Sequence, residues 1–158
     1  MKITELLKQW FSGADIAKLN IAIRTEGGWE GWFQMEFASF LTENNIPYTR
    51  EYPYKSGRAD IMMQTGEDQE LICEIKCYSL LSGSDFTSLV HADLEKLRTC
   101  GCNGFMICLL PVNTQDVDDT TVAYSSLLSD EPELEECARL KLDKDFEFVC
   151  LGGYTRLS

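Results

Sequence analysis

The sequence predicts an α/β fold in which helices flank a central mixed β-sheet. Residues 85–100 carry apolar side chains at helical spacing, and residues 105–110 form a continuous apolar run that fits a strand buried on both faces. Segments of the two kinds alternate along the chain, in the order α, β, β, β, α, β, α, β. Such alternation is typical of helices packed on a sheet.

Each element follows from its local pattern. The segment 48–54 alternates and is rich in Tyr and Thr, which indicates a strand, and paired Asn residues before a proline end the preceding helix. The expected elements are one or two helices over 3–24 with a break near Ser12–Gly13, a helix over 29–43, strands over 48–54, 58–64 and 70–78, a turn over 65–68, a helix over 85–100, a strand over 105–110, one or two helices within 116–136, and a strand over 146–151.

The length of 158 residues fits one domain. The chain has no apolar run long enough for a membrane span and no signal peptide at its N-terminus, so we expect a cytoplasmic protein. Its seven cysteines are then expected to be free thiols. Cys100-Gly-Cys102 lacks a second ligand pair at zinc-finger spacing, and the lone histidine, His91, lies upstream with no partner evident in the sequence.

The charge is strongly acidic, at −12, and unevenly distributed. Residues 1–79 hold eight Lys and Arg against twelve acids, whereas residues 80–158 hold six against fourteen. Proteins that bind nucleic acid usually carry a basic patch. Any such patch is therefore expected in the first half, and the acidic second half is expected to face away from it or toward a basic partner protein.

The clearest candidate site begins on the strand over 70–78. Side chains alternate along a strand, so Glu74 and Lys76 share a face, while Leu71, Cys73 and Ile75 point to the other face. Charged groups on an otherwise apolar strand are costly to bury unless they are paired or bind a metal. The pattern favours a functional role, although a solvated face of an edge strand would also carry these residues.

Asp60 lies on the preceding strand, at hairpin distance from Glu74. A turn near Gly66 would pair the two strands antiparallel and bring both carboxylates to one side. Neighbouring carboxylates repel each other unless a cation lies between them, and Mg²⁺ or Mn²⁺ prefers such oxygen ligands. Asp60 has a simpler interpretation as well, in which it begins the hairpin or pairs with Arg58.

Asp60 followed by Glu74-Ile75-Lys76 resembles the signature of the PD-(D/E)XK, or restriction-endonuclease-like, nucleases. The resemblance covers about residues 28–110, with Ala59 in place of the usual proline. It implies a restriction-endonuclease-like core between an N-terminal helical segment, 1–26, and an acidic C-terminal elaboration, 111–158. It also implies that Asp60, Glu74 and the backbone carbonyl of Ile75 hold Mg²⁺ or Mn²⁺. Lys76 would then orient the attacking water, and the products would carry 5′-phosphates.

The same resemblance implies a further ligand from the helix over 29–43. Glu30 and Gln34 lie four residues apart on one helical face, and Gln34 aligns with the usual acidic position. We favour Glu30 as the ligand with Gln34 assisting, and Glu36 is the alternative.

Nucleic-acid contacts are expected from Arg50, Lys55 and Arg58, which lie among Tyr48, Tyr52 and Tyr54. An ordinary half-exposed strand and loop would show the same pattern. On the helix after the motif, Asp93 and Lys96 lie three residues apart. They are expected either to form a surface ion pair or to lie beside the metal site.

These observations favour a metal-dependent nuclease that hydrolyses DNA, with RNA a weaker expectation. The alternative is a catalytically silent, nuclease-like immunity or regulatory factor whose acidic surface binds a basic protein. We expect no membrane partner, and the sequence leaves a homodimer open.

Overall fold

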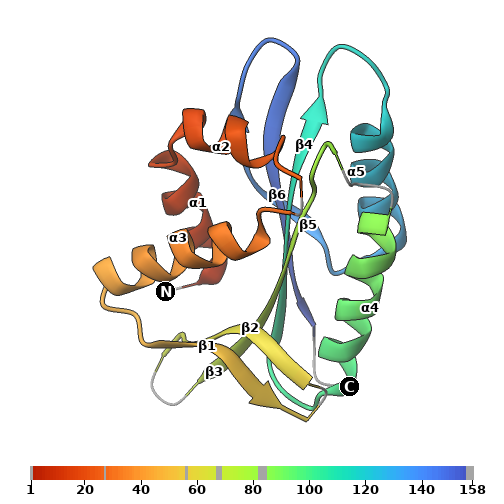
Figure 1. Ribbon diagram of the computed structural model, residues 1–158. Helices are drawn as coiled ribbons and strands as arrows, with labels where there is room; N and C mark the ends of the chain where they lie inside the picture. Colours follow the sequence, from red (N-terminus) through yellow and green to blue (C-terminus); the bar gives the residue numbers. More distant parts are fainter. Residues whose placement is uncertain (1, 27, 56, 67–68, 82–84, 156–158) are drawn as a thin grey trace.

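A computed structural model describes residues 2–26, 28–55, 57–66, 69–81 and 85–155, which form a six-stranded sheet with helices on both faces (Figure 1). The strand order is β1-β2-β3-β4-β6-β5. The β3–β4 pair is parallel, and the other neighbouring pairs are antiparallel. The predicted α/β class with a central mixed sheet is confirmed.

The elements in chain order are α1 (Ile3–Ser12), α2 (Ile16–Ala22), α3 (Glu30–Glu43), β1 (Tyr48–Tyr54), β2 (Gly57–Gln64), β3 (Glu70–Cys77), α4 (Phe86–Thr99), β4 (Gly104–Asn113), α5 (Asp119–Asp130), β5 (Glu135–Lys141) and β6 (Phe146–Thr155). Part of the turn expected over 65–68 lies outside the described residues. Within the described chain, no helix combines the length and apolar character needed to cross a membrane.

The prediction for residues 116–136 was incomplete, because it contained helices alone. A single helix, α5, ends at Asp130, and an unexpected edge strand, β5, follows it. Along β5, Cys137 is buried, whereas most of the other side chains are charged and exposed. An edge strand of this composition lacks the alternating apolar pattern on which strand prediction depends.

Two apolar layers enclose the sheet. Helices α1, α2 and α3 pack on one face, and α4 and α5 pack on the other (Figure 1). Strand β3 contributes to both layers: Leu71, Cys73 and Ile75 point to the α1–α3 side, and Ile72 points to the α4–α5 side. Glu74 and Lys76 therefore lie on a covered face of a central strand. The alternative of a solvated edge strand is wrong.

The β1–β2 hairpin is irregular at Asp60. Ile61 and Met63 pack on the α1–α3 side, but Ala59 packs on the α4–α5 side, although regular alternation would place all three on one face. Across the hairpin from Asp60, Glu51 has a φ of 52°. A left-handed backbone is uncommon for a residue other than glycine, and it interrupts the pleat. The hairpin changes faces at this point, and Asp60 lies at the change.

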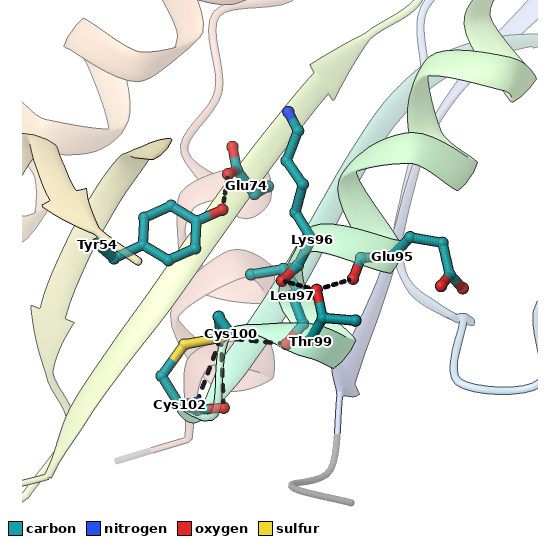
Figure 2. The surroundings of a disulfide bond; sticks show 8 residues. All are labelled: Tyr54, Glu74, Glu95, Lys96, Leu97, Thr99, Cys100 and Cys102. Atoms are coloured by element: carbon teal, nitrogen blue, oxygen red, sulfur yellow. Dashed lines mark hydrogen bonds between the residues drawn. A yellow bond between two sulfur atoms is a disulfide. The ribbon is translucent and has the colours of Figure 1, made fainter. Parts of the chain in front are cut away.

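The expectation of free thiols is wrong for two of the seven cysteines. Cys100 and Cys102 form a disulfide at the C-terminal end of α4, one turn beyond Lys96 (Figure 2). The remaining cysteines, at positions 73, 77, 108, 137 and 150, are free, and all but Cys77 are buried.

Candidate functional site

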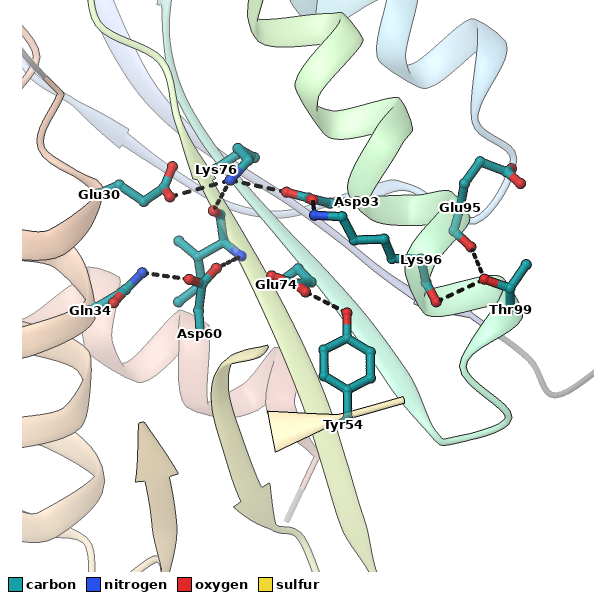
Figure 3. Close-up of polar contacts among 11 residues, drawn as sticks. Glu30, Gln34, Tyr54, Asp60, Glu74, Lys76, Asp93, Glu95, Lys96 and Thr99 are labelled. Atoms are coloured by element: carbon teal, nitrogen blue, oxygen red, sulfur yellow. Dashed lines mark hydrogen bonds and ion pairs between the residues drawn. The ribbon is translucent and has the colours of Figure 1, made fainter. Parts of the chain in front are cut away.

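Asp60 closes a gap between β2 and β3. The ladder pairing of these strands ends at Ile61 and Cys73, so the next amide on this side of β3 has no backbone partner on β2. Asp60 supplies that partner: its Oδ2 accepts a hydrogen bond of 2.7 Å from the Ile75 N–H. Its Oδ1 accepts a bond of 2.8 Å from Gln34 Nε2 (Figure 3). The carboxylate thus lies between the strands rather than above one face of the sheet.

Gln34 is held in turn by Arg50. The Nη2 of Arg50 donates a hydrogen bond of 3.2 Å to Gln34 Oε1, which leaves the amide nitrogen of Gln34 directed at Asp60. Gln34 is buried, and a buried amide needs partners for both of its ends. The guanidinium of Arg50 thus orients Gln34, and the nucleic-acid contact of Arg50 stays a prediction.

Glu74 lies beside Asp60 on the neighbouring strand. It is 4% exposed, and its Oε1 accepts a hydrogen bond of 2.7 Å from the hydroxyl of Tyr54. Burial raises the pKa of Glu74 to about 7; the Tyr54 hydroxyl opposes the rise, and repulsion from Asp60 adds to it. Burial also raises the pKa of Asp60, against the opposing effect of the Ile75 N–H.

Lys76 completes the group. Its ammonium lies 3.3 Å from Glu30 Oε1 and 3.0 Å from Asp93 Oδ2, between helices α3 and α4 (Figure 3). It also donates to the carbonyl of Ile75 at 3.3 Å. Burial alone would lower the pKa of Lys76, but attraction to Glu30 and the hydrogen bond to Asp93 raise it overall, so the side chain is a cation.

The described residues of the site carry an excess of negative charge. Four carboxyl groups, of Glu30, Asp60, Glu74 and Asp93, share two lysines, Lys76 and Lys96. No group of three or more His, Cys, Asp and Glu side chains in the described chain has the arrangement of a complete metal site. Two carboxylates and the Ile75 carbonyl nevertheless form a hard-oxygen donor set, and the excess charge matches a divalent cation. These oxygens are of the donor type that Mg²⁺ and Mn²⁺ prefer.

The remaining predicted residues lie elsewhere. Glu36, the alternative ligand, faces α2, where its carboxylate lies 3.8 Å from Lys18 Nζ. Lys55 and Arg58 are exposed at the end of the β1–β2 hairpin. The sequence indicated no partner for His91; in the structure its ring contacts the buried carboxylate of Glu131.

Two neighbours of the site carried weaker signals in the sequence. The expected Asp93–Lys96 ion pair is present, but Asp93 is only 3% exposed and also contacts Lys76, so it lies beside the candidate site as well. Its position three residues after Val90 and seven after Phe86 places a charge on the apolar face of α4, and that was the available signal. The bond from Tyr54 to Glu74 depends on the strand order and on the change of faces in the hairpin, which no local pattern encodes.

Arg50, Gln34, Asp60 and the Ile75 amide therefore form one continuous hydrogen-bonded chain, with Glu74 and Lys76 beside it. Comparison of the sequence and the structure with protein-family models, curated proteins and solved structures gives no match.

Proposed function

We propose that this protein is a metal-dependent nuclease of the PD-(D/E)XK type, with a restriction-endonuclease-like core, that hydrolyses phosphodiester bonds of DNA in preference to RNA. One observation carries the proposal. Asp60 and Glu74, from adjacent antiparallel strands, meet where the β2–β3 ladder stops, and Lys76 lies next to them. Buried carboxyl groups that repel each other are costly for folding, so their presence together supports a ligand of opposite charge.

Asp60, Glu74 and the carbonyl of Ile75 would hold Mg²⁺ or Mn²⁺. When bound, the ion supplies a more acidic water and neutralises charge on the phosphate. Gln34 and the Ile75 amide fix the carboxylate of Asp60, so this side chain would not need to move when the ion binds. Lys76, positioned by Glu30 and Asp93, would turn the N–H that it now donates to the Ile75 carbonyl toward the attacking water. That water attacks phosphorus, the bond to the 3′-oxygen breaks, and the products carry a 5′-phosphate and a 3′-hydroxyl.

The charge distribution supports the enzyme over the silent binding protein. Several acids of the second half pair within the chain: Glu131 and Glu133 with Arg98, and Glu136 and Glu147 with Arg139. These carboxylates are less available to a basic protein partner. Lys55 and Arg58, by contrast, are exposed at the end of the hairpin that carries Asp60, where a phosphate backbone would approach.

The decisive experiment incubates the pure protein with supercoiled, linear and branched DNA and with RNA, in Mn²⁺ or in EDTA. Glu74→Ala removes a metal ligand, so we expect turnover to fall by roughly 10³-fold or more while substrate affinity changes little. Lys76→Ala should also abolish cleavage but should keep Mn²⁺ binding in a calorimetric titration, because an ammonium is not a ligand. Glu36→Ala is the matched control from α3 and should cut normally.

Two outcomes would contradict the proposal. If Glu74→Ala cuts as well as the wild type, the active site lies elsewhere. If the wild type neither binds Mn²⁺ nor cuts any substrate in the panel, the binding protein is the better description, and its basic partner should be sought.

A further inference from the structure

The Cys100–Cys102 disulfide differs in its setting from the other cysteines. It joins residues two apart in sequence, across the turn that leads from α4 into β4. The Cys102 side chain is half-buried, whereas Cys100 is 9% exposed. Cys102 is therefore the more accessible of the two residues for an attacking thiol.

This bond contributes little as a structural cross-link. A disulfide stabilises a fold largely by restricting the unfolded chain, and the effect grows with the length of the closed loop. A loop closed between residues two apart is near the minimum. The neighbouring backbone already holds the turn, since the Asn103 carbonyl accepts a hydrogen bond of 2.8 Å from the Ile72 N–H. We therefore expect the bond to open without loss of the native structure.

The surroundings accommodate both redox states of Cys100. The Cys102 N–H donates to Cys100 Sγ at 3.3 Å, and such a bond stabilises a thiolate that leaves during exchange. The carbonyl oxygen of Leu97 lies 3.1 Å from the same sulfur. Once Cys100 is protonated, its S–H has this acceptor within reach without any movement of the chain.

A polar surface pocket of about 410 Å³ opens beside Cys102. Its lining residues are Gln64, Gln69, Glu70, Cys102 and Asn103, three of which have amide side chains. Amide groups both donate and accept hydrogen bonds, so they complement the peptide bonds and carboxylates of a short peptide. The pocket is therefore suited to a small peptide thiol rather than to an apolar one.

We propose that Cys100 and Cys102 form a reversible thiol–disulfide exchange centre whose reductant is a small peptide thiol bound in this amide-lined pocket. The thiolate of the first peptide attacks Cys102 Sγ, a mixed disulfide forms, and Cys100 leaves as a thiolate that takes a proton. A second peptide thiolate attacks the peptide sulfur of the mixed disulfide, releasing Cys102 and the peptide disulfide. Two electrons pass to the protein, and one disulfide replaces another. The proposal is independent of the proposed nuclease activity.

The test equilibrates the native full-length protein in buffers of reduced and oxidised glutathione, quenches with acid, and labels all thiols with N-ethylmaleimide after denaturation. Intact mass should change from five adducts to seven as the buffer becomes reducing, because five of the seven cysteines are already free. Seven adducts in every buffer would show that the bond does not form. Five adducts even in excess dithiothreitol would show an inert bond. Either result overturns the proposal.

Three variants test whether the transition depends on this bond and on its pocket. In dithiothreitol buffers, Cys102→Ala should lose the two-adduct transition, and Cys137→Ala, which removes a buried thiol, should keep it. The double variant Gln64→Ala and Gln69→Ala should slow reduction by glutathione several-fold and leave reduction by dithiothreitol unchanged. Equal rates with glutathione for this variant and the wild type would exclude the pocket as the binding site.

Discussion

Asp60 shows how one residue joins the fold to the site. Its carboxylate replaces a missing ladder partner for the Ile75 amide, and the same group is a proposed metal ligand. A buried amide without a partner is costly, so the strand irregularity at Glu51 and Asp60 persists only with an acceptor at this point. Backbone strain of this kind is concentrated at functional sites in proteins, which agrees with the proposed role.

Glu74 predicts a dependence of stability on pH. Burial raises its pKa from 4.5 to about 7 in the folded protein, so between these values the folded state binds more protons than the unfolded state. Stability should therefore fall as the pH rises from about 4.5 to about 7. After allowance for solvent screening, the contribution is of the order of 1–2 kcal/mol. Glu74→Gln should flatten this part of the profile, measured by urea unfolding at a series of pH values.

The control for this experiment is Glu36→Gln, which removes a carboxylate from α3 away from the site and should leave the slope intact. If the free energy of unfolding of Glu74→Gln varies with pH as it does in the wild type, Glu74 is not the group that titrates between pH 4.5 and 7.

At the residue scale, the sequence predicted those contacts that depend on spacing within one element. Glu30 and Gln34 were assigned to one face of α3 by their four-residue separation, and the structure brings both to the group around Asp60. The role of Arg50 was not predicted, because its position over Gln34 depends on how the hairpin docks against α3. Its basic charge alone indicated a phosphate contact.

At the scale of elements, α4 joins the candidate site to the far edge of the sheet. Asp93 on its buried face contacts Lys76, and Arg98, one turn later, pairs with Glu131 and Glu133 in the segment between α5 and β5. Glu131 is 5% exposed, so its charge is compensated chiefly by Arg98 and by contact with His91. Helix α4 is therefore held by charge pairs at its middle and near its C-terminal end.

We expect Arg98→Ala to destabilise the fold by about 2 kcal/mol or more, because it leaves the buried carboxylate of Glu131 without its main partner. Arg139→Ala is the matched control. Arg139 also pairs with two glutamates, but their side chains are 30–31% exposed, so the loss should be about 0.5–1 kcal/mol. Urea unfolding of both variants measures the difference. Equal losses would show that Glu131 is hydrated in the folded protein.

The sequence identified elements that have their own periodicity and missed one that has none. Helix α4 and strand β4 were evident because their apolar residues recur at helical spacing or without interruption. Strand β5 is defined by its pairing with β6 across a bulge between Glu136 and Ala138, and a pairing of this kind is a tertiary contact. Local pattern cannot encode an edge strand whose side chains mostly face water.

For the whole molecule, the central question is how a chain with a net charge of −12 would bind a polyanion. In the proposed function, the contacts come from exposed cations on one hairpin. Lys55 and Arg58 are exposed on the β1–β2 hairpin, while several acids of the second half pair with Arg98 or Arg139 on other elements. In the proposed function, each phosphate neutralised by these two cations would release its condensed counterions.

This argument gives a salt-dependent prediction for the hairpin. Lys55→Gln with Arg58→Gln should weaken DNA binding at low salt and reduce the slope of log affinity against log salt by about two, one for each phosphate that is no longer neutralised. The measurement is fluorescence anisotropy of labelled DNA in the Lys76→Ala background, which prevents cleavage during the titration.

The control is Lys141→Gln with Lys144→Gln, which makes the same change of net charge at the opposite edge of the sheet, on and just after β5. If binding depends on the hairpin, this control should keep the wild-type slope, because exposed charges farther apart than about 10 Å are largely screened at moderate salt. An equal reduction in both variants would mean that net charge governs the interaction, and the hairpin would then have no specific role in binding DNA.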